Sequence, residues 1–261
     1  MSTTMRTDGA LSVGIVERQA WHDAIDLIEG AELPRVEADI RDAWAAAGIE
    51  TSTGLDPKWG LALALTREAS AGMRLLSAYR GVMFDATALV RGADAVTITQ
   101  RHKLREGDDG PELEASDPMI EVALAPSAQM WSLLLRVLPP LDVVRAEPSS
   151  DALVRGDALV VELDDVPEAL RRNPAALAER VPWIPVLPES VRDALQPVAS
   201  IFAVGLAAAK GGTRAVNDAW AVGERGLYHL VPGEPGVFAV PAGHVGARLV
   251  QRFADVAAGR A

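Results

Sequence analysis

The four histidines of this chain, His22, His102, His229 and His244, are its best candidates for acid–base or metal chemistry near neutral pH. A metal-binding helix would carry a second histidine three or four residues from the first, and none of the four has such a neighbour. None lies in a carboxylate-rich stretch. The spacing therefore predicts no metal centre. His22 is expected on a helix surface or boundary, and His244 in the first turn of a helix.

Two glycine-containing loops have compositions that ligand-binding loops share. Ala209–Arg214 (Ala-Lys-Gly-Gly-Thr-Arg) contains phosphate-loop residues but lacks the upstream glycine and the right order, so a turn between two strands is the simpler interpretation. Gly107–Glu114 is acidic but lacks the alternating oxygen ligands of a calcium loop. No nucleophile elbow, dinucleotide fingerprint or P-loop occurs. The sequence thus predicts no catalytic residue and no cofactor.

Composition excludes further classes of site and partner. The chain has no cysteine, which rules out disulfides, thiol nucleophiles and thiolate metal sites. A net charge of −11 over 261 residues argues against general binding to nucleic acid or to anionic membranes. The first residues lack the apolar core of a signal peptide, and no apolar run approaches the ~20 residues that cross a bilayer. We therefore expect a cytoplasmic protein.

The elements that would position any site begin in the middle of the chain. Runs rich in apolar and β-branched residues, separated by glycines, predict four strands: Met73–Tyr79, Val82–Arg91, Ala95–His102 and Met119–Leu124. Pro126 then opens an amphipathic helix that extends to Leu138. The polar stretch Lys103–Pro118 is predicted to be an exposed, poorly ordered loop.

The same order of elements returns later in the chain. Strands are predicted at Ala199–Lys210, Ala215–Val222, Gly226–Val231 and Val237–Val240, and a helix follows Pro241. The turn at Gly92 has its counterpart at Gly223, and Pro126 matches Pro241. We interpret the chain as an internal duplication.

Each predicted half also starts with a strand and helices. In the first half these are Leu11–Val16, Arg18–Glu29, a helix from Pro34 to Ala47 and Pro57–Ala69. In the second half they are Ala158–Leu163, Val166–Arg172, Pro174–Val181 and Pro188–Val198. Each unit therefore has the order β-α-α-α-β-β-β-β-α, which gives an α+β fold of antiparallel sheets with flanking helices.

The predicted organisation has four parts. Residues 1–10 are a disordered N-terminus, 11–140 the first repeat, 141–156 a linker and 157–261 the second repeat. The repeats could form separate bodies on the linker or one fused body about a pseudo-two-fold axis. We favour the fused body because the linker is short and neither set of helices looks self-sufficient.

One face of the second sheet has an unusual composition. Pairing Arg91 with Ala95 across a three-residue turn places polar pairs on the solvent face of the first hairpin. The same register in the second hairpin places Val222 and four candidate partner-binding residues on one face, with Trp220 opposite Tyr228: Val216, Trp220, Tyr228 and Leu230. Three explanations stay open: a shifted register, burial in the core, or a partner-docking surface.

The order of the predicted elements and the composition of five segments resemble the EspG family of type VII (ESX) secretion-associated chaperones. The resemblance spans nearly the whole chain and contains no catalytic signature. The segments that carry it are the strand–helix pair Val13–Ile28, the helix ending Ala46-Ala-Gly-Ile, the segment Leu55–Arg67, the glycine-hinged hairpin Ala88–Thr97, and the segment Met130–Pro140 ending Val-Leu-Pro-Pro.

The resemblance implies a chaperone that binds a helical-hairpin secretion substrate near the tip of a duplicated α+β fold. The substrate would be a PE–PPE pair or a WXG100-like protein, and the chain would be no enzyme. No binding residue of the family can be matched to this sequence. The alternatives are an enzyme on an α+β scaffold without a recognisable motif, and a structural or regulatory homodimer.

Overall fold

The computed structural model describes residues 6–8, 11–29, 32–69, 71–107, 110–156, 158–159, 187, 189–209, 212–230 and 237–257. The predicted helices Val166–Arg172 and Pro174–Val181 lie outside this part of the chain. Of the predicted strand Ala158–Leu163, only the first two residues are described, and they form β9 (Ala158–Leu159).

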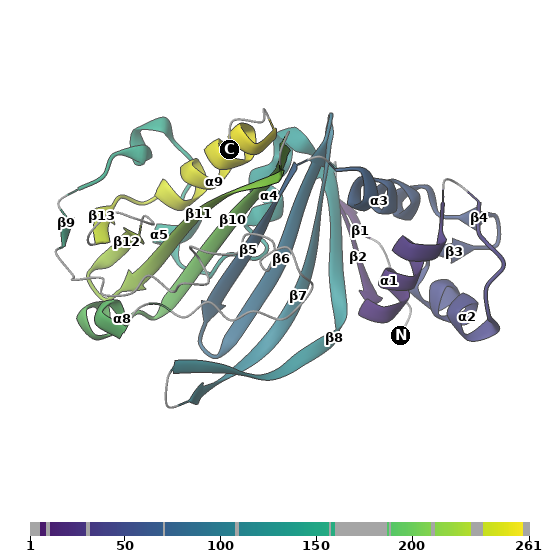
Figure 1. The fold of residues 1–261 in the computed structure, drawn as a ribbon, viewed down its shortest axis with the longest axis horizontal. Coiled ribbons are helices and arrows are strands. Elements are labelled where there is room, and N and C mark those ends of the chain that lie inside the picture. The colour runs from purple at the N-terminus through teal and green to yellow at the C-terminus, as the bar shows by residue number, and fades with distance from the viewer. Residues whose placement is uncertain are drawn as a thin grey trace.

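Eleven of the described strands form one continuous sheet (Figure 1), in which every neighbouring pair is antiparallel. From one edge to the other the strands are β1 (Arg6–Asp8), β2 (Leu11–Glu17), β8 (Gly110–Pro126), β7 (Asp94–Gly107), β6 (Val82–Arg91), β5 (Ala71–Tyr79), β10 (Ala199–Ala209), β11 (Gly212–Gly223), β12 (Gly226–Leu230), β13 (Val237–Val240) and β9.

The pair β5–β10 joins the two halves of the sheet. It is antiparallel and runs from Ala71 opposite Ala207 to Tyr79 opposite Ala199. Four strands continue outward on each side in the same chain order, ending with the strand that opens each half, and β1 adds an extra edge beside β2. The turns at Gly92 and Gly223 occupy matching places in this order. The α+β fold is confirmed, whereas a strand-for-strand superposition of the halves stays a prediction.

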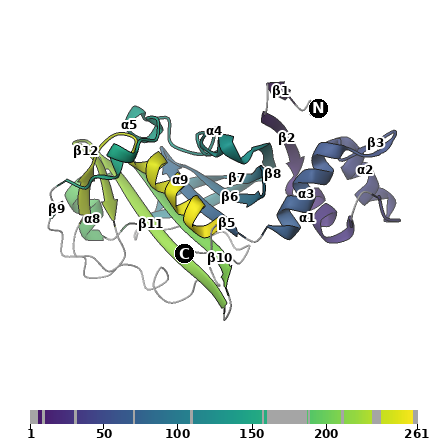
Figure 2. The same ribbon diagram turned by 90° about the horizontal axis from the view of Figure 1, so that it is seen from above.

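Helices lie on both faces of the sheet, as Figures 1 and 2 show. One face packs against α1 (Arg18–Leu27), α2 (Ala38–Ala47) and α3 (Pro57–Glu68), with the hairpin β3 (Glu50–Thr51) and β4 (Gly54–Leu55), and against α8 (Glu189–Leu195). The other face packs against α4 (Met130–Leu134), α5 (Asp142–Arg145) and α9 (His244–Ala257), with the short helices η1 (Ser127–Gln129) and η2 (Ser150–Leu153).

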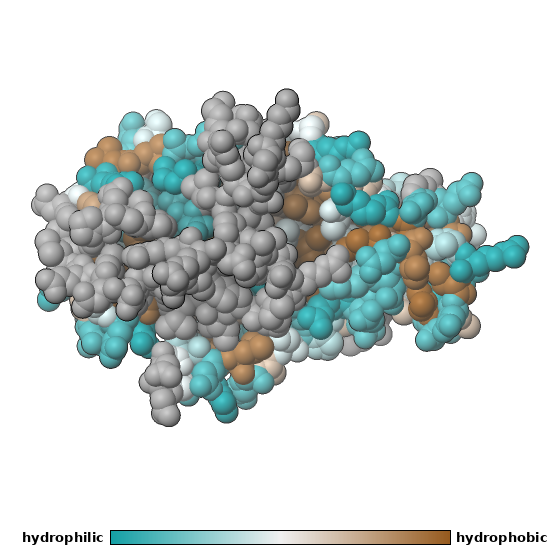
Figure 3. Space-filling model, viewed as in Figure 1, coloured by the Kyte–Doolittle hydropathy of each residue, from teal (hydrophilic) through white to brown (hydrophobic). Residues whose placement is uncertain are grey.

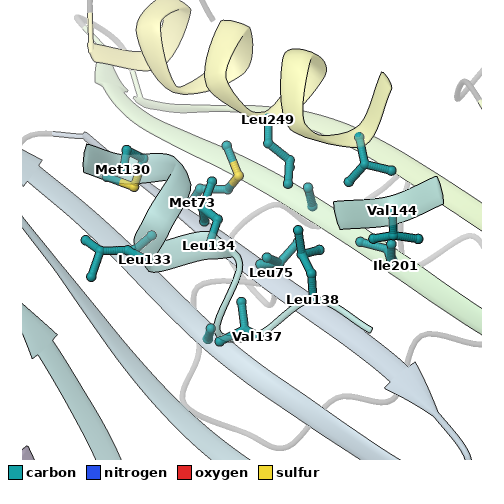
Figure 4. Close-up of a cluster of buried hydrophobic side chains, with 14 of the residues drawn as sticks. Met73, Leu75, Met130, Leu133, Leu134, Val137, Leu138, Val144, Ile201 and Leu249 are labelled. Carbon is teal, nitrogen blue, oxygen red and sulfur yellow. The ribbon is translucent and has the colours of Figure 1, made fainter. Parts of the chain in front are cut away.

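The alternation of side chains along each strand explains the two layers. On β5, Leu75 points into the cluster beneath α4 and α9 (Figure 4), whereas its neighbour Leu76 packs with α8 on the opposite face. On β7, Ala95 and Val96 divide in the same way between α4 and the α1–α3 helices. Because both faces are covered, the central strands are apolar on both sides.

Local signals define the ends of the first-half helices. The Asp56 side chain accepts hydrogen bonds from the backbone N–H groups of Lys58 and Trp59, and Pro57 occupies the first turn of α3. Gly48 ends α2 in the left-handed region, with φ 73°. Between α2 and α1, the Trp44 indole donates a hydrogen bond to the Ala20 carbonyl at 3.1 Å. These contacts hold the three helices together beside β2, β7 and β8.

The prediction of a poorly ordered loop at Lys103–Pro118 is wrong. Its described residues, 103–107 and 110–118, instead extend β7 and β8 into a long hairpin, in which Leu104 pairs with Leu113. Cross-strand ion pairs join Lys103 to Glu114 and Arg105 to Glu112, each at 2.7 Å. Opposite charges that face each other across a hairpin stabilise strand pairing. The sequence alone does not show which charges will face each other, so the segment resembles a polar loop.

The segment predicted as a linker, residues 141–156, is packed against the rest of the molecule. It contains α5 and η2, which contact α9 and bury Val144 and Ala152. The helix after Pro126 ends at Leu134 rather than Leu138, although Leu138 is buried. Residues 6–8 of the N-terminus predicted to be disordered form β1, which pairs with β2.

One sheet shared by both halves predicts a single unfolding transition. We expect Leu75→Ala on β5 and Ile201→Ala on β10 each to lower the free energy of unfolding by about 3 kcal/mol, because both side chains are fully buried in one cluster. Thermal unfolding followed by circular dichroism is the measurement. Leu61→Ala, at a leucine that is 39% exposed, is the matched control. Two separate transitions, each shifted by only one variant, would contradict the fused body.

Candidate functional site

The strongest concentration of chemically capable side chains among the described residues lies between α9 and the second half of the sheet. Its members come from β11, β12 and α9, and we call them the polar cluster: Asp218, Trp220, His229, His244, Arg248 and Arg252.

Asp218 is the centre of the polar cluster and is only 3% exposed. Its carboxylate accepts hydrogen bonds from His229 Nε2 at 2.9 Å, Arg248 Nε at 3.1 Å and Arg252 Nε at 2.7 Å. Burial alone would raise the pKa of this carboxyl, but the hydrogen bonds and the two guanidinium charges outweigh burial and lower the pKa to about 2. Asp218 is therefore ionised at neutral pH and neutralises charge that α9 brings to the sheet.

His244, in the first turn of α9, contacts Trp220 of β11 and His229 of β12. Its Nδ1 accepts a hydrogen bond from the Trp220 indole N–H at 3.1 Å. The ring centroids of His229 and His244 are 4.8 Å apart, and Trp220 stacks on His229 at 5.1 Å. Burial is the main cause that lowers the pKa of His244 to about 4, and the nearby positive groups act in the same direction. His244 is therefore neutral at pH 7.

The contact between His229 and Asp218 has the form of a general base with its orienting carboxylate. A base must reach a substrate, however, and His229 is 0% exposed. Its second nitrogen, Nδ1, is buried without a hydrogen-bond partner among the described residues. The same part of the chain contains no group of three or more metal-ligating side chains arranged around a metal. We conclude that the polar cluster fastens α9 to the sheet.

His102 forms a second buried histidine site, on β7. Its Nδ1 lies 2.9 Å from Ser116 Oγ on β8. Its Nε2 is buried and has no partner in the described part of the chain. A proton there would be an unsatisfied donor, so we assign the proton to Nδ1, which then donates to Ser116. Burial lowers the pKa of His102. The ring is thus a donor to the exposed serine and does not activate it. His22 lies on α1.

The spacing of residues in the sequence did not predict that His229, His244 and Asp218 lie close together. A signal was present, because the three α9 members occur at every fourth position (244, 248 and 252) and therefore lie on one helix face. Asp218 and Trp220 are two residues apart on β11 and share one sheet face in the same way. Only the pairing of β11 with β12 and the docking of α9 bring these two patterns together.

The four predicted docking residues do not share a surface. The register prediction was wrong, because both hairpin turns contain two residues rather than three: Arg91 pairs with Asp94, and Gly223 with Gly226. Trp220 consequently lies opposite His229, and Tyr228 lies opposite Ala221.

Of the alternatives left open by the sequence, core burial describes three of the four residues. Trp220 is 0% exposed beneath α9, whereas Tyr228 and Leu230, each 7% exposed, pack with α8 on the opposite face. The backbone of Val216 pairs with Gly205, and its side chain lies outside the described part.

Exposed large apolar side chains are dispersed over the described surface, and Figure 3 shows one face on which apolar and polar residues alternate. Two of them, Ile15 (45% exposed) and Met119 (39% exposed), come from the neighbouring strands β2 and β8. The other exposed apolar side chains are Leu27, Leu61, Val154, Val198 and Val250.

No described helix is long and apolar enough to span a membrane.

Comparison with known proteins gives a structural similarity but no match to a family model or a curated protein. Among solved structures, it is similar to the Mycobacterium tuberculosis type VII secretion system chaperone EspG5, determined in complex with a PE25-PPE41 dimer. The match covers 94% of this chain and 96% of that one, with a TM-score of 0.48 and 10% sequence identity.

Replacement of Trp220 separates a core role from a docking role. We expect Trp220→Ala to lower the free energy of unfolding by about 4 kcal/mol, because it leaves a cavity beneath α9 and removes the hydrogen bond to His244. Chemical denaturation measures the loss. Trp131→Ala, at a half-buried tryptophan, should cost less. A Trp220→Ala variant with an unchanged melting temperature would show that the side chain is not core.

Asp218→Asn tests the electrostatic role of the polar cluster. We expect a loss of about 3 kcal/mol at pH 7, because two partly buried guanidinium groups lose their counter-ion. In the natural chain the depressed pKa contributes about 2 kcal/mol of stability above pH 4, which is lost as pH falls toward 2.

Denaturation between pH 7 and pH 2 should therefore show a shallower acid dependence for Asp218→Asn. Asp193→Asn, at an exposed aspartate on α8, is the matched control and should retain the natural profile. Equal slopes for the natural chain and Asp218→Asn would refute the assignment.

Proposed function

We propose that this chain is a cytoplasmic chaperone or adaptor of a type VII (ESX) secretion system. In this proposal it binds a helical-hairpin substrate, a PE–PPE pair or a WXG100-like protein, and keeps that substrate soluble until export. The proposal extends the resemblance to the EspG family that the sequence carries from Val13–Ile28 to Met130–Pro140.

The strand order is the observation that carries the proposal. The resemblance implies a duplicated α+β fold, and the sheet has matching strand orders on the two sides of the β5–β10 pair. Such an order is specific, because a sheet of this size could be connected in many other ways. The matching strand orders of the two sides therefore support the proposal independently of residue identity.

The chemistry of the polar cluster also favours binding over catalysis. Asp218, His229 and His244 are 3%, 0% and 2% exposed, and their hydrogen bonds join α9 to β11 and β12. A protein that works by binding needs a stable scaffold, and these contacts supply one. An enzyme that used the same groups would first have to uncover them.

The test is co-expression with each helical-hairpin protein encoded beside this gene. We expect one of them to be soluble only when this chain is present, and to elute with it as a stoichiometric complex in size-exclusion chromatography. An unrelated helical hairpin of similar length is the control and should elute separately.

The outcomes of co-expression separate the remaining alternatives. A chain that elutes at twice its mass and captures none of the neighbouring proteins would favour the structural or regulatory homodimer. Failure to form a complex with every neighbouring candidate, with a monomeric chain, would refute the chaperone proposal.

A further inference from the structure

The hydrogen bond between Trp220 and His244 fixes the protonation state of His244 while α9 is docked. The indole N–H of Trp220 can only donate, so the His244 Nδ1 that receives it must present a lone pair. A proton added at this nitrogen would face another N–H group. His244 can therefore accept a proton on Nδ1 only if its hydrogen bond to β11 breaks.

His229 lies beside His244 and is tied to the sheet. Its Nε2 donates to the ionised Asp218. Its Nδ1 is buried and has no partner among the described residues. The ring centroids of His229 and His244 are 4.8 Å apart, so a charge on His244 would lie against a fully buried ring rather than in water.

The charged groups around His244 do not compensate an added proton. Among the described residues, the charges that disfavour a proton on His244 come from His229, Arg248 and Arg155, and the charge that favours it comes from Asp218. Asp218 is already shared between Arg248 and Arg252. The other described elements packed on α9 add little. The Arg145 guanidinium of α5 donates to backbone carbonyls, and Asp151 of η2 is exposed. Arg74 of β5 is paired with Asp85, and α4 and the described side chains of β10 are uncharged.

We propose that α9 is an acid-released helix: protonation of His244 breaks its hydrogen bond to Trp220 and detaches α9 from β11 and β12 while β5, β6, β7 and β8 remain paired. Release would uncover the apolar side chains that α9 buries against the sheet, including Val245, Leu249 and Phe253. The device therefore converts a change of pH into exposure of apolar surface at the C-terminal end of the chain.

Hydrogen exchange detected by mass spectrometry tests the proposal on the full chain. After correction for the intrinsic pH dependence of exchange, protection of α9 should fall on the order of tenfold between pH 7 and pH 5, because the released histidine regains an ordinary pKa. Protection of β6 should fall by much less over the same range.

His244→Asn is the decisive variant, because its Oδ1 can accept the Trp220 hydrogen bond in place of Nδ1 but does not titrate. We expect it to lose most of the pH dependence in α9, whereas the control His22→Asn on α1 should behave like the natural chain. If His244→Asn does not fold at pH 7, Trp220→Phe replaces it. That variant removes the donor, so His244 can accept a proton while α9 stays docked, and the pH dependence of α9 protection should again decrease.

Three results would overturn the proposal. The first is an α9 profile in His244→Asn, or in Trp220→Phe if that is used, that equals the natural one. The second is a simultaneous loss of protection in α9 and β6, which would indicate global unfolding, to which the buried His102 on β7 would contribute. The third is an α9 protection that does not change between pH 7 and pH 5.

Discussion

The backbone hydrogen bonds between β5 and β10 are the contacts on which the rest of the structure depends. They join strands that are far apart in the chain, and they make one sheet where the sequence contains two strand groups. A continuous sheet in turn has two continuous faces, and each must be covered. The helices of both halves therefore serve a common core, and α9 of the second half packs against β5 of the first.

The two faces are covered by different means. Helix α9 packs closely against α4. A Cβ added at Gly246 of α9 would come within 2.9 Å of the Trp131 ring of α4, so the absence of a side chain at Gly246 permits this approach. Polar contacts also fix α9, because Arg248 and Arg252 both donate to Asp218 on β11. On the opposite face the first-half helices pack around Trp21, Trp44 and Trp59. Close packing and a buried ion network thus act together on one helix.

Much of the fold follows from local patterns. Apolar runs between glycines located the strands, and β6 begins and ends where its sequence predicts. The predictions that failed, such as the loop at Lys103–Pro118, depend on contacts between residues that are not neighbours in the sequence. The ion pairs of the β7–β8 hairpin join charges seven to eleven residues apart, so that segment looks like a solvated loop.

The candidate site was predictable only in part. A turn shorter by one residue moved Trp220 and Tyr228 to opposite faces, and no rule of composition distinguishes the two turn lengths at Gly223. The sequence placed members of the polar cluster on one face of α9 and one face of β11, but it could not bring the two faces together, because Asp218 and Arg252 are 34 residues apart and meet only through tertiary docking.

The strand pair at the centre also constrains how such a sheet can be divided. Either half expressed alone would leave β5 or β10 with a long row of unpaired N–H and C=O groups, flanked by apolar side chains on both faces. An edge of this kind associates with any similar strand in solution. A single half would therefore be stable only as a dimer of two halves joined at that edge, or else would aggregate.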